Sequence, residues 1–295
     1  MSDLNLNALL KNGPVITDGA WGTELQARGL ASGTCSESCC LDQPELPAAV
    51  ARAYIDSGAK IILTNSFGGN RLTLARHGEE ARTRDLNIAA ARCSVREANG
   101  KALVFGSIGP TGKMIMMGEV GPDELEDVFS EQASALAEGG VHGLVIETMT
   151  DRDELAAALR GARTTGLPVA ACMAFGSGPE YDRTMMGVSV EEAVETMEKE
   201  GATICGSNCG IGVDHILPIC ERFKRATNKP IWMKPNAGLP EMEKGRTIYR
   251  MTPDHFAEQA AKLVTAGARF IGGCCGTSPV FISALRKHPG LFHQQ

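Results

Sequence analysis

The sequence predicts an α/β fold, a single-domain (β/α)8 TIM barrel over residues 1–295. Eight short and almost entirely apolar runs alternate with longer amphipathic segments, as expected of parallel strands that are buried on both faces and joined by helices. Several amphipathic segments end in Gly-Ala or Gly-Gly directly before the next apolar run, where glycine commonly caps a helix. Polar, glycine and cysteine residues gather where the runs end, and the carboxyl ends of the strands carry the active site in such barrels.

The expected strands are eight runs rich in valine, isoleucine and other apolar residues. They cover 14–18, 60–67, 102–110, 143–149, 168–175, 202–209, 230–238 and 268–277. Successive parallel strands are joined by right-handed crossovers, so eight such units close naturally into a barrel. A doubly wound open sheet is the alternative, but it rarely needs eight units, and no GxGxxG motif follows the first run.

Recognisable start signals mark the helices between these strands. Segment 44–58 opens at a proline, and Ser189 with Glu192 three residues later fits a capping box. Thr252 precedes Pro253, which places proline at the first helical position. The expected C-terminal glycine caps lie in Gly58-Ala59, Gly139-Gly140, Gly201-Ala202 and Gly267-Ala268. No low-complexity tract or linker divides the chain, which supports one domain.

Composition excludes several classes of function. The 29 Lys and Arg against 35 Asp and Glu give a net charge of −6, which argues against a nucleic-acid partner. No apolar stretch approaches the ~20 residues needed to cross a membrane, and the N-terminus has no signal-peptide pattern, so we expect a cytoplasmic protein. Ten cysteines in a reducing compartment favour metal binding or thiol chemistry over disulfides.

Three cysteines stand at expected strand ends. Cys209 ends the sixth strand, and Cys274 with Cys275 ends the eighth. These strands are roughly 10 Å apart, a gap that side chains leaning over the barrel mouth can close to reach a shared metal. Three thiolates suit Zn²⁺, and three protein ligands with one open position are typical of a catalytic site. The alternative is that Cys274 and Cys275 are packed thiols or a redox pair in a glycine-rich turn.

A set of motifs in fixed order resembles the homocysteine S-methyltransferase family. The motifs are DGAWGTEL, TNSFGGN, GSIGPTG, ETMTD, GSNC, KPNAGLP and GGCCGT. The resemblance covers almost the whole chain, and the combination of GSNC with a later GGCCGT is its most specific part. The runs LVFGSIGPTG and ETMTD look most like the homocysteine-binding module of cobalamin-dependent methionine synthase, and less like the betaine-using enzymes.

The resemblance implies that Cys209, Cys274 and Cys275 hold Zn²⁺, with the homocysteine sulfur as fourth ligand. A coordinating metal deprotonates a thiol and makes it a nucleophile. By the same resemblance, Glu147 receives the ammonium group of homocysteine, whereas its structural alternative is an ion pair with a neighbouring Lys or Arg. Asp18 and Gly19 look like the rest of the amino-acid pocket, although Asp18 could instead cap the turn.

The methyl donor follows less directly from the sequence. The favoured expectation is methylation of homocysteine to methionine by a methyl-corrinoid (cobalamin) carried on a separate partner protein, because one barrel leaves no residues for a cobalamin module. An S-methylmethionine- or betaine-type donor, or a different thiol acceptor, is the alternative within this chemistry. A non-catalytic barrel that binds zinc or a corrinoid protein is the alternative from another class.

Some residues depart from the family pattern. Cys35, Cys39 and Cys40 stand in the loop GTCSESCCLDQPE, where they could form a second metal or redox site or remain free thiols. The other cysteines are expected to be small buried apolar residues; they are Cys93, Cys172, Cys205 and Cys220. Trp21 is expected to line the donor pocket or to pack beneath its loop. Asn65, Asn208 and Asn236 are expected to hold loops in place.

Overall fold

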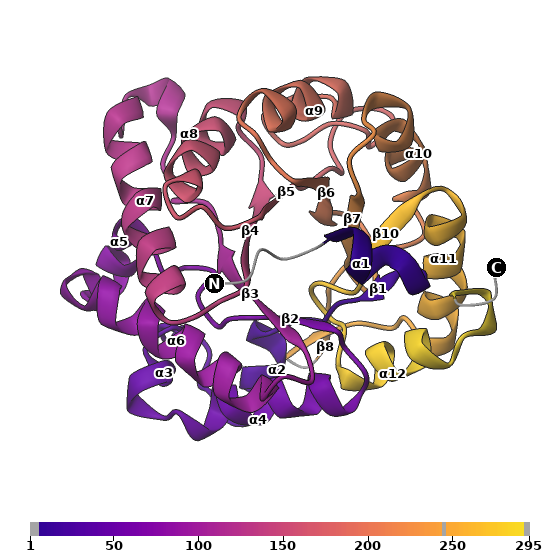
Figure 1. Cartoon of the computed structure of the whole chain (residues 1–295), viewed down its shortest axis with the longest axis horizontal. Helices are drawn as coiled ribbons and strands as arrows, with labels where there is room; N and C mark the ends of the chain where they lie inside the picture. The colour runs from indigo at the N-terminus through magenta and orange to yellow at the C-terminus, as the bar shows by residue number, and fades with distance from the viewer. Residues whose placement is uncertain (1–5, 244–245, 292–295) are drawn as a thin grey trace.

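A ring of eight parallel strands forms the centre of the computed structural model, which describes residues 6–243 and 246–291 (Figure 1). The strands are β1 Val15–Ile16, β2 Ile61–Leu63, β3 Leu103–Ile108, β4 Gly143–Met149, β5 Val169–Met173, β6 Ile204–Cys209, β7 Ile231–Pro235 and β10 Ala268–Ile271. Their order is β1-β10-β7-β6-β5-β4-β3-β2, and a parallel bridge between Thr17 and Ile61 joins the two outer strands. The predicted barrel is confirmed, with each strand inside its expected run.

Most of the helices surround the ring on its outer side (Figure 1). They are α1 Leu6–Leu9, α2 Gly22–Ala27, α3 Cys39–Asp42, α4 Glu45–Asp56, α5 Arg71–Leu74, α6 Thr83–Ala98, α7 Pro122–Glu138, α8 Arg152–Arg163, α9 Val190–Lys199, α10 Leu217–Ala226, α11 Pro253–Thr265 and α12 Pro279–Lys287. None of these described helices is long and apolar enough to span a bilayer.

The predicted helix signals are present in the structure. Ser189 and Glu192 form the reciprocal capping box at the start of α9. The Thr252 side chain accepts a hydrogen bond from the His255 backbone at the start of α11. Left-handed glycines with positive φ precede the strands as expected; they are Gly58, Gly140, Gly201 and Gly267. Local sequence therefore determines where these helices begin and end.

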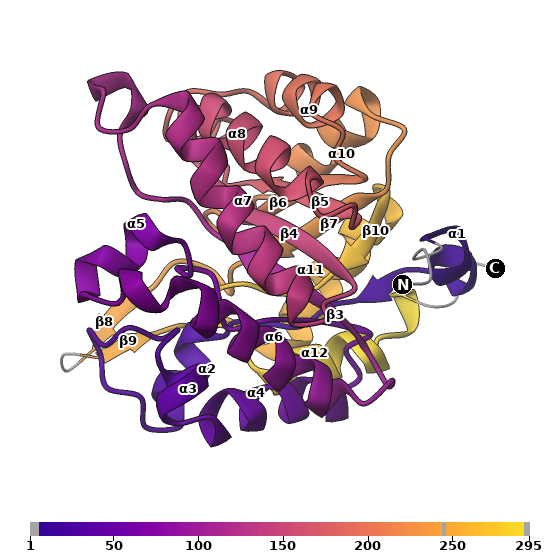
Figure 2. The same ribbon diagram turned by 60° about the vertical axis from the view of Figure 1, so that its left-hand side comes forward.

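A small antiparallel hairpin was not predicted. Strands β8 Glu241–Glu243 and β9 Arg246–Ile248 pair within the long connection between β7 and α11. The hairpin has no apolar run that would signal a buried strand, because β8 consists of two glutamates around an exposed methionine. The hairpin and α5 lie at the carboxyl end of the barrel, whereas α1 lies at the opposite end (Figure 2).

Aromatic rings fill the barrel interior below the carboxyl ends of the strands. Phe105, Trp232 and Phe270 stack in sequence, with ring centroids 6.0 Å and 5.2 Å apart. All three are fully buried. Two glycines allow this close packing: a Cβ at Gly143 would lie 2.8 Å from the Phe105 ring, and one at Gly206 would lie 2.0 Å from the Trp232 backbone carbonyl oxygen. This aromatic stack forms a solid floor beneath the mouth.

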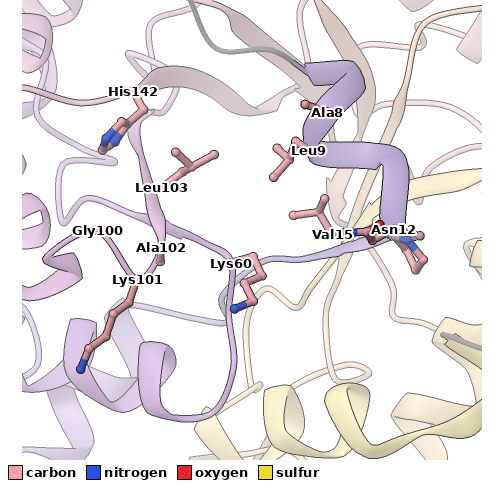
Figure 3. Close-up of a pocket in the computed structure, with 12 residues that line it drawn as sticks. Ala8, Leu9, Asn12, Val15, Lys60, Gly100, Lys101, Ala102, Leu103 and His142 are labelled. Carbon is pink, nitrogen blue, oxygen red and sulfur yellow. The ribbon is translucent and has the colours of Figure 1, made fainter. Parts of the chain in front are cut away.

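A cavity lies at the amino end of the barrel. Leu6, Leu9 and Leu10 pack partly buried against the interior cluster, and the Arg269 guanidinium donates to the Leu10 carbonyl at 2.6 Å. A cavity of about 580 Å³ remains between this segment and the starts of β2, β3 and β4 (Figure 3). None of the predicted site residues lines it.

The close approach of the β7 backbone makes Gly206 intolerant of a side chain. We expect Gly206→Ala to lower the free energy of unfolding by about 1–3 kcal/mol, because the added methyl group overlaps the β7 backbone. Urea unfolding followed by circular dichroism measures this change. Gly22→Ala is the matched control, since nothing lies within 4 Å of a Cβ there; equal unfolding midpoints for the two variants would contradict the packing argument.

Candidate functional site

A cavity of about 490 Å³ opens at the carboxyl end of the barrel. The loops that follow several strands line it, and most of the predicted site residues meet there: Gly19, Glu147, Cys209, Cys274 and Cys275. Asp18 is the exception and does not line the cavity. The expectation that functional groups gather at the strand ends therefore holds for the described residues.

The three predicted cysteines converge. Cys209 Sγ lies 3.2 Å from Cys274 Sγ and 3.9 Å from Cys275 Sγ. Over the described ranges, no other trio of His, Cys, Asp or Glu side chains brings its ligand atoms within 4.8 Å of one another. Such short distances between sulfur atoms, with all three cysteines only partly exposed, suit a shared soft divalent metal.

Backbone contacts from β7 bring the two cysteine loops together. The Cys274 amide donates to the Pro235 carbonyl at 2.8 Å, and the Ala237 amide donates to the Cys275 carbonyl at 2.9 Å. On the other side, Asn236 Nδ2 donates to the Gly210 carbonyl at 2.7 Å. The loop after β7 thus connects the end of β6 to the end of β10. These two strands are not neighbours in the sheet, because β7 lies between them.

Backbone conformation is unusual at this junction. Cys209 has φ +61°, a left-handed value that non-glycine residues rarely adopt, and the following Gly210 has φ +73°. A Cβ at Gly210 would lie 2.4 Å from the Phe175 carbonyl oxygen. Local strain of this kind is often found at functional sites, and here it ends β6 sharply at the cysteine.

The sulfur atoms cannot all be charged without a counter-cation. Hydrogen bonds from the Cys209 and Cys274 thiols lower the pKa of Cys275 to about 3. The hydrogen bonds of Cys209 with Cys274 and Cys275, together with burial, raise the pKa of Cys209 well above its ordinary value. The protein alone therefore stabilises one shared negative charge, and a divalent metal would stabilise the other two thiolates. Asn236 Oδ1, buried and without a hydrogen-bond partner among the described residues, adds an unused oxygen to this polar region.

Glu147 lies on β4 and lines the same cavity. Its Oε1 accepts a hydrogen bond from Ser107 Oγ at 2.5 Å, and its Oε2 accepts one from Asn208 Nδ2 at 3.3 Å. Burial raises the pKa of Glu147 to about 7, and the nearby Lys234 ammonium opposes this shift. Because burial makes the charged form of this carboxylate unfavourable, a cationic ligand group beside it would be stabilising.

Asn208 connects the carboxylate to the cysteines. Its Oδ1 accepts from the Thr148 amide at 2.6 Å, which holds Thr148 at φ +62°. Its Nδ2 contacts Thr148 Oγ1 at 2.7 Å and Cys274 Sγ at 3.8 Å. Asn208 therefore holds the loop after β4, as the sequence predicted, and also fixes the distance between the two halves of the site.

Asp18 lies beneath the cavity wall with no exposed surface. Its Oδ1 accepts from Lys234 Nζ at 2.5 Å, and its Oδ2 accepts from the Leu63 amide and Trp21 Nε1, both at 2.7 Å. The adjacent Gly19 lines the cavity, and a Cβ there would lie 2.7 Å from Thr277 Oγ1. Contact of Asp18 and Gly19 with substrate stays a prediction, and Asp18 has three protein donors already.

Lys234 is the residue that sequence reasoning missed. It lies on β7, has 2% exposure and lines the cavity. Burial lowers its pKa, but the Asp18 and Glu147 carboxylates outweigh that effect, so the pKa of Lys234 is raised and the group is charged. The available signal was a single lysine in the otherwise apolar run PIWMKP, because a lysine is almost never fully buried without a partner.

The additional cysteines form no second metal group of three within the described residues. Cys39 and Cys40 are buried, and Asn65 Nδ2 lies 3.4 Å and 3.5 Å from their sulfur atoms. Cys35 Sγ donates to Glu37 Oε2 at 3.5 Å. Glu37 itself lines the cavity, so this cysteine-rich loop supplies part of the outer wall. The remaining cysteines are buried, as predicted.

A parallel barrel whose mouth brings three cysteine sulfur atoms beside a buried carboxylate has the chemistry to bind a metal ion and to activate a thiol. A family model matches this chain: residues 15–288 match homocysteine S-methyltransferase. The chain belongs to the homocysteine S-methyltransferase family, a family of methyltransferases. The resemblance inferred from the sequence motifs is thereby confirmed.

Curated relatives and solved structures agree with this assignment. The chain is 30% identical over 302 residues to methionine synthase from Mycobacterium tuberculosis and 29% identical over 299 residues to that from Mycobacterium leprae. The matches cover 95% and 94% of this chain but only 25% and 24% of those proteins, so the chain spans about a quarter of their length. The metallated homocysteine methyltransferase MmuM from Escherichia coli shares the fold, with TM-score 0.79, 23% identity and coverage of 95% of this chain and 98% of that one.

The geometry of the sulfur atoms predicts a metal stoichiometry. We expect about one zinc ion per chain after loading, and a large loss of bound zinc in Cys275→Ala, because two thiolates hold zinc far less tightly than three. Metal analysis after dialysis measures this. Cys220→Ala, a buried cysteine of α10, is the control that should retain zinc; retention by Cys275→Ala would refute the ligand assignment.

Proposed function

We propose that this chain methylates the sulfur of homocysteine to give methionine, using zinc held by Cys209, Cys274 and Cys275. The observation that carries the proposal is the convergence of three cysteine sulfur atoms and the buried Glu147 carboxylate on one cavity. A thiol-binding centre and a group that favours an ammonium ion are the two features needed to recognise an amino acid with a thiol side chain. Family membership supports the same reaction.

When bound, zinc would lower the pKa of the acceptor thiol and keep its sulfur nucleophilic. Glu147 would bind the ammonium group through a charge-assisted hydrogen bond, while Ser107 and Asn208 hold its two oxygens in place. Gly19 would let the chain approach the substrate closely, and Asp18 would act by fixing Lys234 and Trp21. The aromatic floor below the site would exclude water from that side.

In the transfer itself, the homocysteine thiol gives up its proton to solvent, and its sulfur forms a bond to the methyl carbon of the donor. The bond between that carbon and its carrier breaks, and the carrier keeps the electron pair. The protein therefore needs to hold sulfur and methyl group in line, which is a matter of positioning. No general acid is required, because the carrier leaves without a proton.

We infer that the donor is a methyl-corrinoid carried outside the described barrel, on a partner protein or module. Similarity to methionine synthases, whose chains are about four times longer than the matched region, supports this donor. Exposed methionines on the loops after β3, β5 and β7 also support a large docking partner; they are Met114, Met116, Met117, Met185 and Met242.

A small cationic donor of the S-methylmethionine or betaine type is the second candidate. The outer part of the cavity is lined by Trp21, Phe67 and the Glu37 carboxylate. Aromatic faces together with a carboxylate attract sulfonium and quaternary ammonium groups. This observation favours a donor that would enter the cavity directly, with no partner protein.

A donor panel distinguishes these candidates. We expect zinc-loaded protein to consume homocysteine thiol with methylcobalamin, and to do so more slowly or not at all with S-methylmethionine, betaine and dimethylsulfonioacetate. Thiol loss and methionine formation are measured in parallel. Turnover with a small onium donor alone would favour the second candidate. Zinc-loaded protein that uses none of these donors would support the non-catalytic barrel.

Glu147 predicts a pH dependence. Because its pKa is raised to about 7, the carboxylate is present above that pH and is lost as the pH falls through it. We therefore expect kcat/KM for homocysteine to fall below about pH 7. Glu147→Gln should raise KM about 10- to 150-fold, since charge-assisted hydrogen bonds contribute ~1.5–3 kcal/mol. The variant should also show a flatter fall of kcat/KM at acidic pH. An unchanged pH profile in the variant would argue against the role of Glu147.

A further inference from the structure

We propose that Lys234 binds the α-carboxylate of the acceptor and so restricts the site to amino-acid thiols. The inference rests on the proposed function and names the group that recognises the second charge of homocysteine. It arises from one buried ammonium whose hydrogen-bonding capacity the described protein uses only in part.

Lys234 Nζ has three N–H donors. One is donated to Asp18 Oδ1 at 2.5 Å, and Asp18 is its single ion-pair partner over the described ranges. The side chain is 2% exposed, yet it lines the cavity. A buried charged group with unused donors is costly, and the cavity is the place from which an acceptor can reach it. An anionic oxygen of the substrate would satisfy those donors.

The charges around the cavity point to the same group. Among its described lining residues, Lys234 is the only basic one, whereas Glu37, Glu147 and the three cysteines can all carry negative charge. A substrate carboxylate therefore has one cation available. Backbone amides near Gly19 can add hydrogen bonds, but they supply no full countercharge.

Lys234 and Glu147 act on opposite ends of the amino-acid group. They form no ion pair within 4.0 Å, although each influences the pKa of the other. The two charges therefore remain separate, with Lys234 for the carboxylate and Glu147 for the ammonium. This arrangement fixes which way the substrate zwitterion lies relative to the cysteines, and it leaves the thiol arm free to reach the sulfur centre.

Asp18 positions Lys234. Its second carboxylate oxygen is held by the Leu63 amide and Trp21 Nε1, so the carboxylate cannot rotate freely. The ammonium that it anchors is correspondingly fixed. Asp18 would therefore affect carboxylate recognition through Lys234 even though it does not line the cavity.

Three thiols separate the contributions of the two charges. Homocysteine carries both groups, 3-aminopropane-1-thiol lacks the carboxylate, and 4-mercaptobutanoate lacks the ammonium. We expect the zinc-loaded native chain to prefer homocysteine over 3-aminopropane-1-thiol by about 10- to 150-fold in kcat/KM, the value of one charge-assisted hydrogen bond. Calorimetric binding of the same thiols gives a readout that does not depend on the methyl donor.

In Lys234→Met this preference, measured within the variant so that any general loss of activity cancels, should fall to nearly 1. The methionine variant leaves Asp18 without its ion-pair partner and could be destabilised. Lys234→Gln is therefore a second test: it keeps a hydrogen-bond donor toward Asp18, and it should lose the same preference for homocysteine. Lys262→Met, at an exposed lysine of α11, is the control. Glu147→Gln should instead reduce the preference over 4-mercaptobutanoate.

The outcomes separate this inference from the proposed function. Methylation of homocysteine with an unchanged preference in the lysine variants would overturn the role of Lys234 and leave the reaction intact. A native chain that does not distinguish homocysteine from 3-aminopropane-1-thiol would overturn it as well, without any variant. Absence of methylation with every donor would overturn the proposed function, and the calorimetric preference would then still decide the role of Lys234.

Discussion

The ion pair between Asp18 and Lys234 is the interaction on which the rest of the site depends. Asp18 joins three strands: it follows β1, accepts from the β2 backbone at Leu63 and binds the β7 lysine. The barrel closes between β1 and β2 through one bridge, Thr17 to Ile61, so this carboxylate replaces missing ladder contacts at the seam. Removing one partner would leave an uncompensated buried charge, which commonly costs about 3–5 kcal/mol.

The site is assembled by the loops after the strands, and asparagines hold those loops in register. Asn208 connects Glu147 to Cys274, and Asn236 connects the β7 loop to the end of β6. The Asn208 amide serves as both donor and acceptor where two loops meet, which neither a carboxylate nor an ammonium can do, whereas the Asn236 side chain acts there as a donor. The Glu147 carboxylate and the cysteine sulfur atoms are therefore mechanically coupled, because Asn208 contacts both.

Sequence alone predicted the ring of strands, the helix caps and the convergence of the cysteines, since each follows from local periodicity or from the topology of a parallel barrel. It did not predict the β8–β9 hairpin, whose strands are short, exposed and polar. It also did not predict the place of Asp18 or the importance of Lys234. Both depend on which residues meet across the barrel, 216 positions apart in the chain, and no local pattern carries that information.

The stack of Phe105, Trp232 and Phe270 has an electrostatic consequence for the charges above it. Aromatic rings without exposed surface form a medium of low dielectric constant, in which charges interact far more strongly than in water. Lys234 lies two residues after Trp232 on β7, and its ammonium interacts electrostatically with Asp18, Glu147 and Cys274. The barrel core thus strengthens the electrostatic interactions between these side chains. A single charged group that enters the cavity would therefore change the pKa values of all of them.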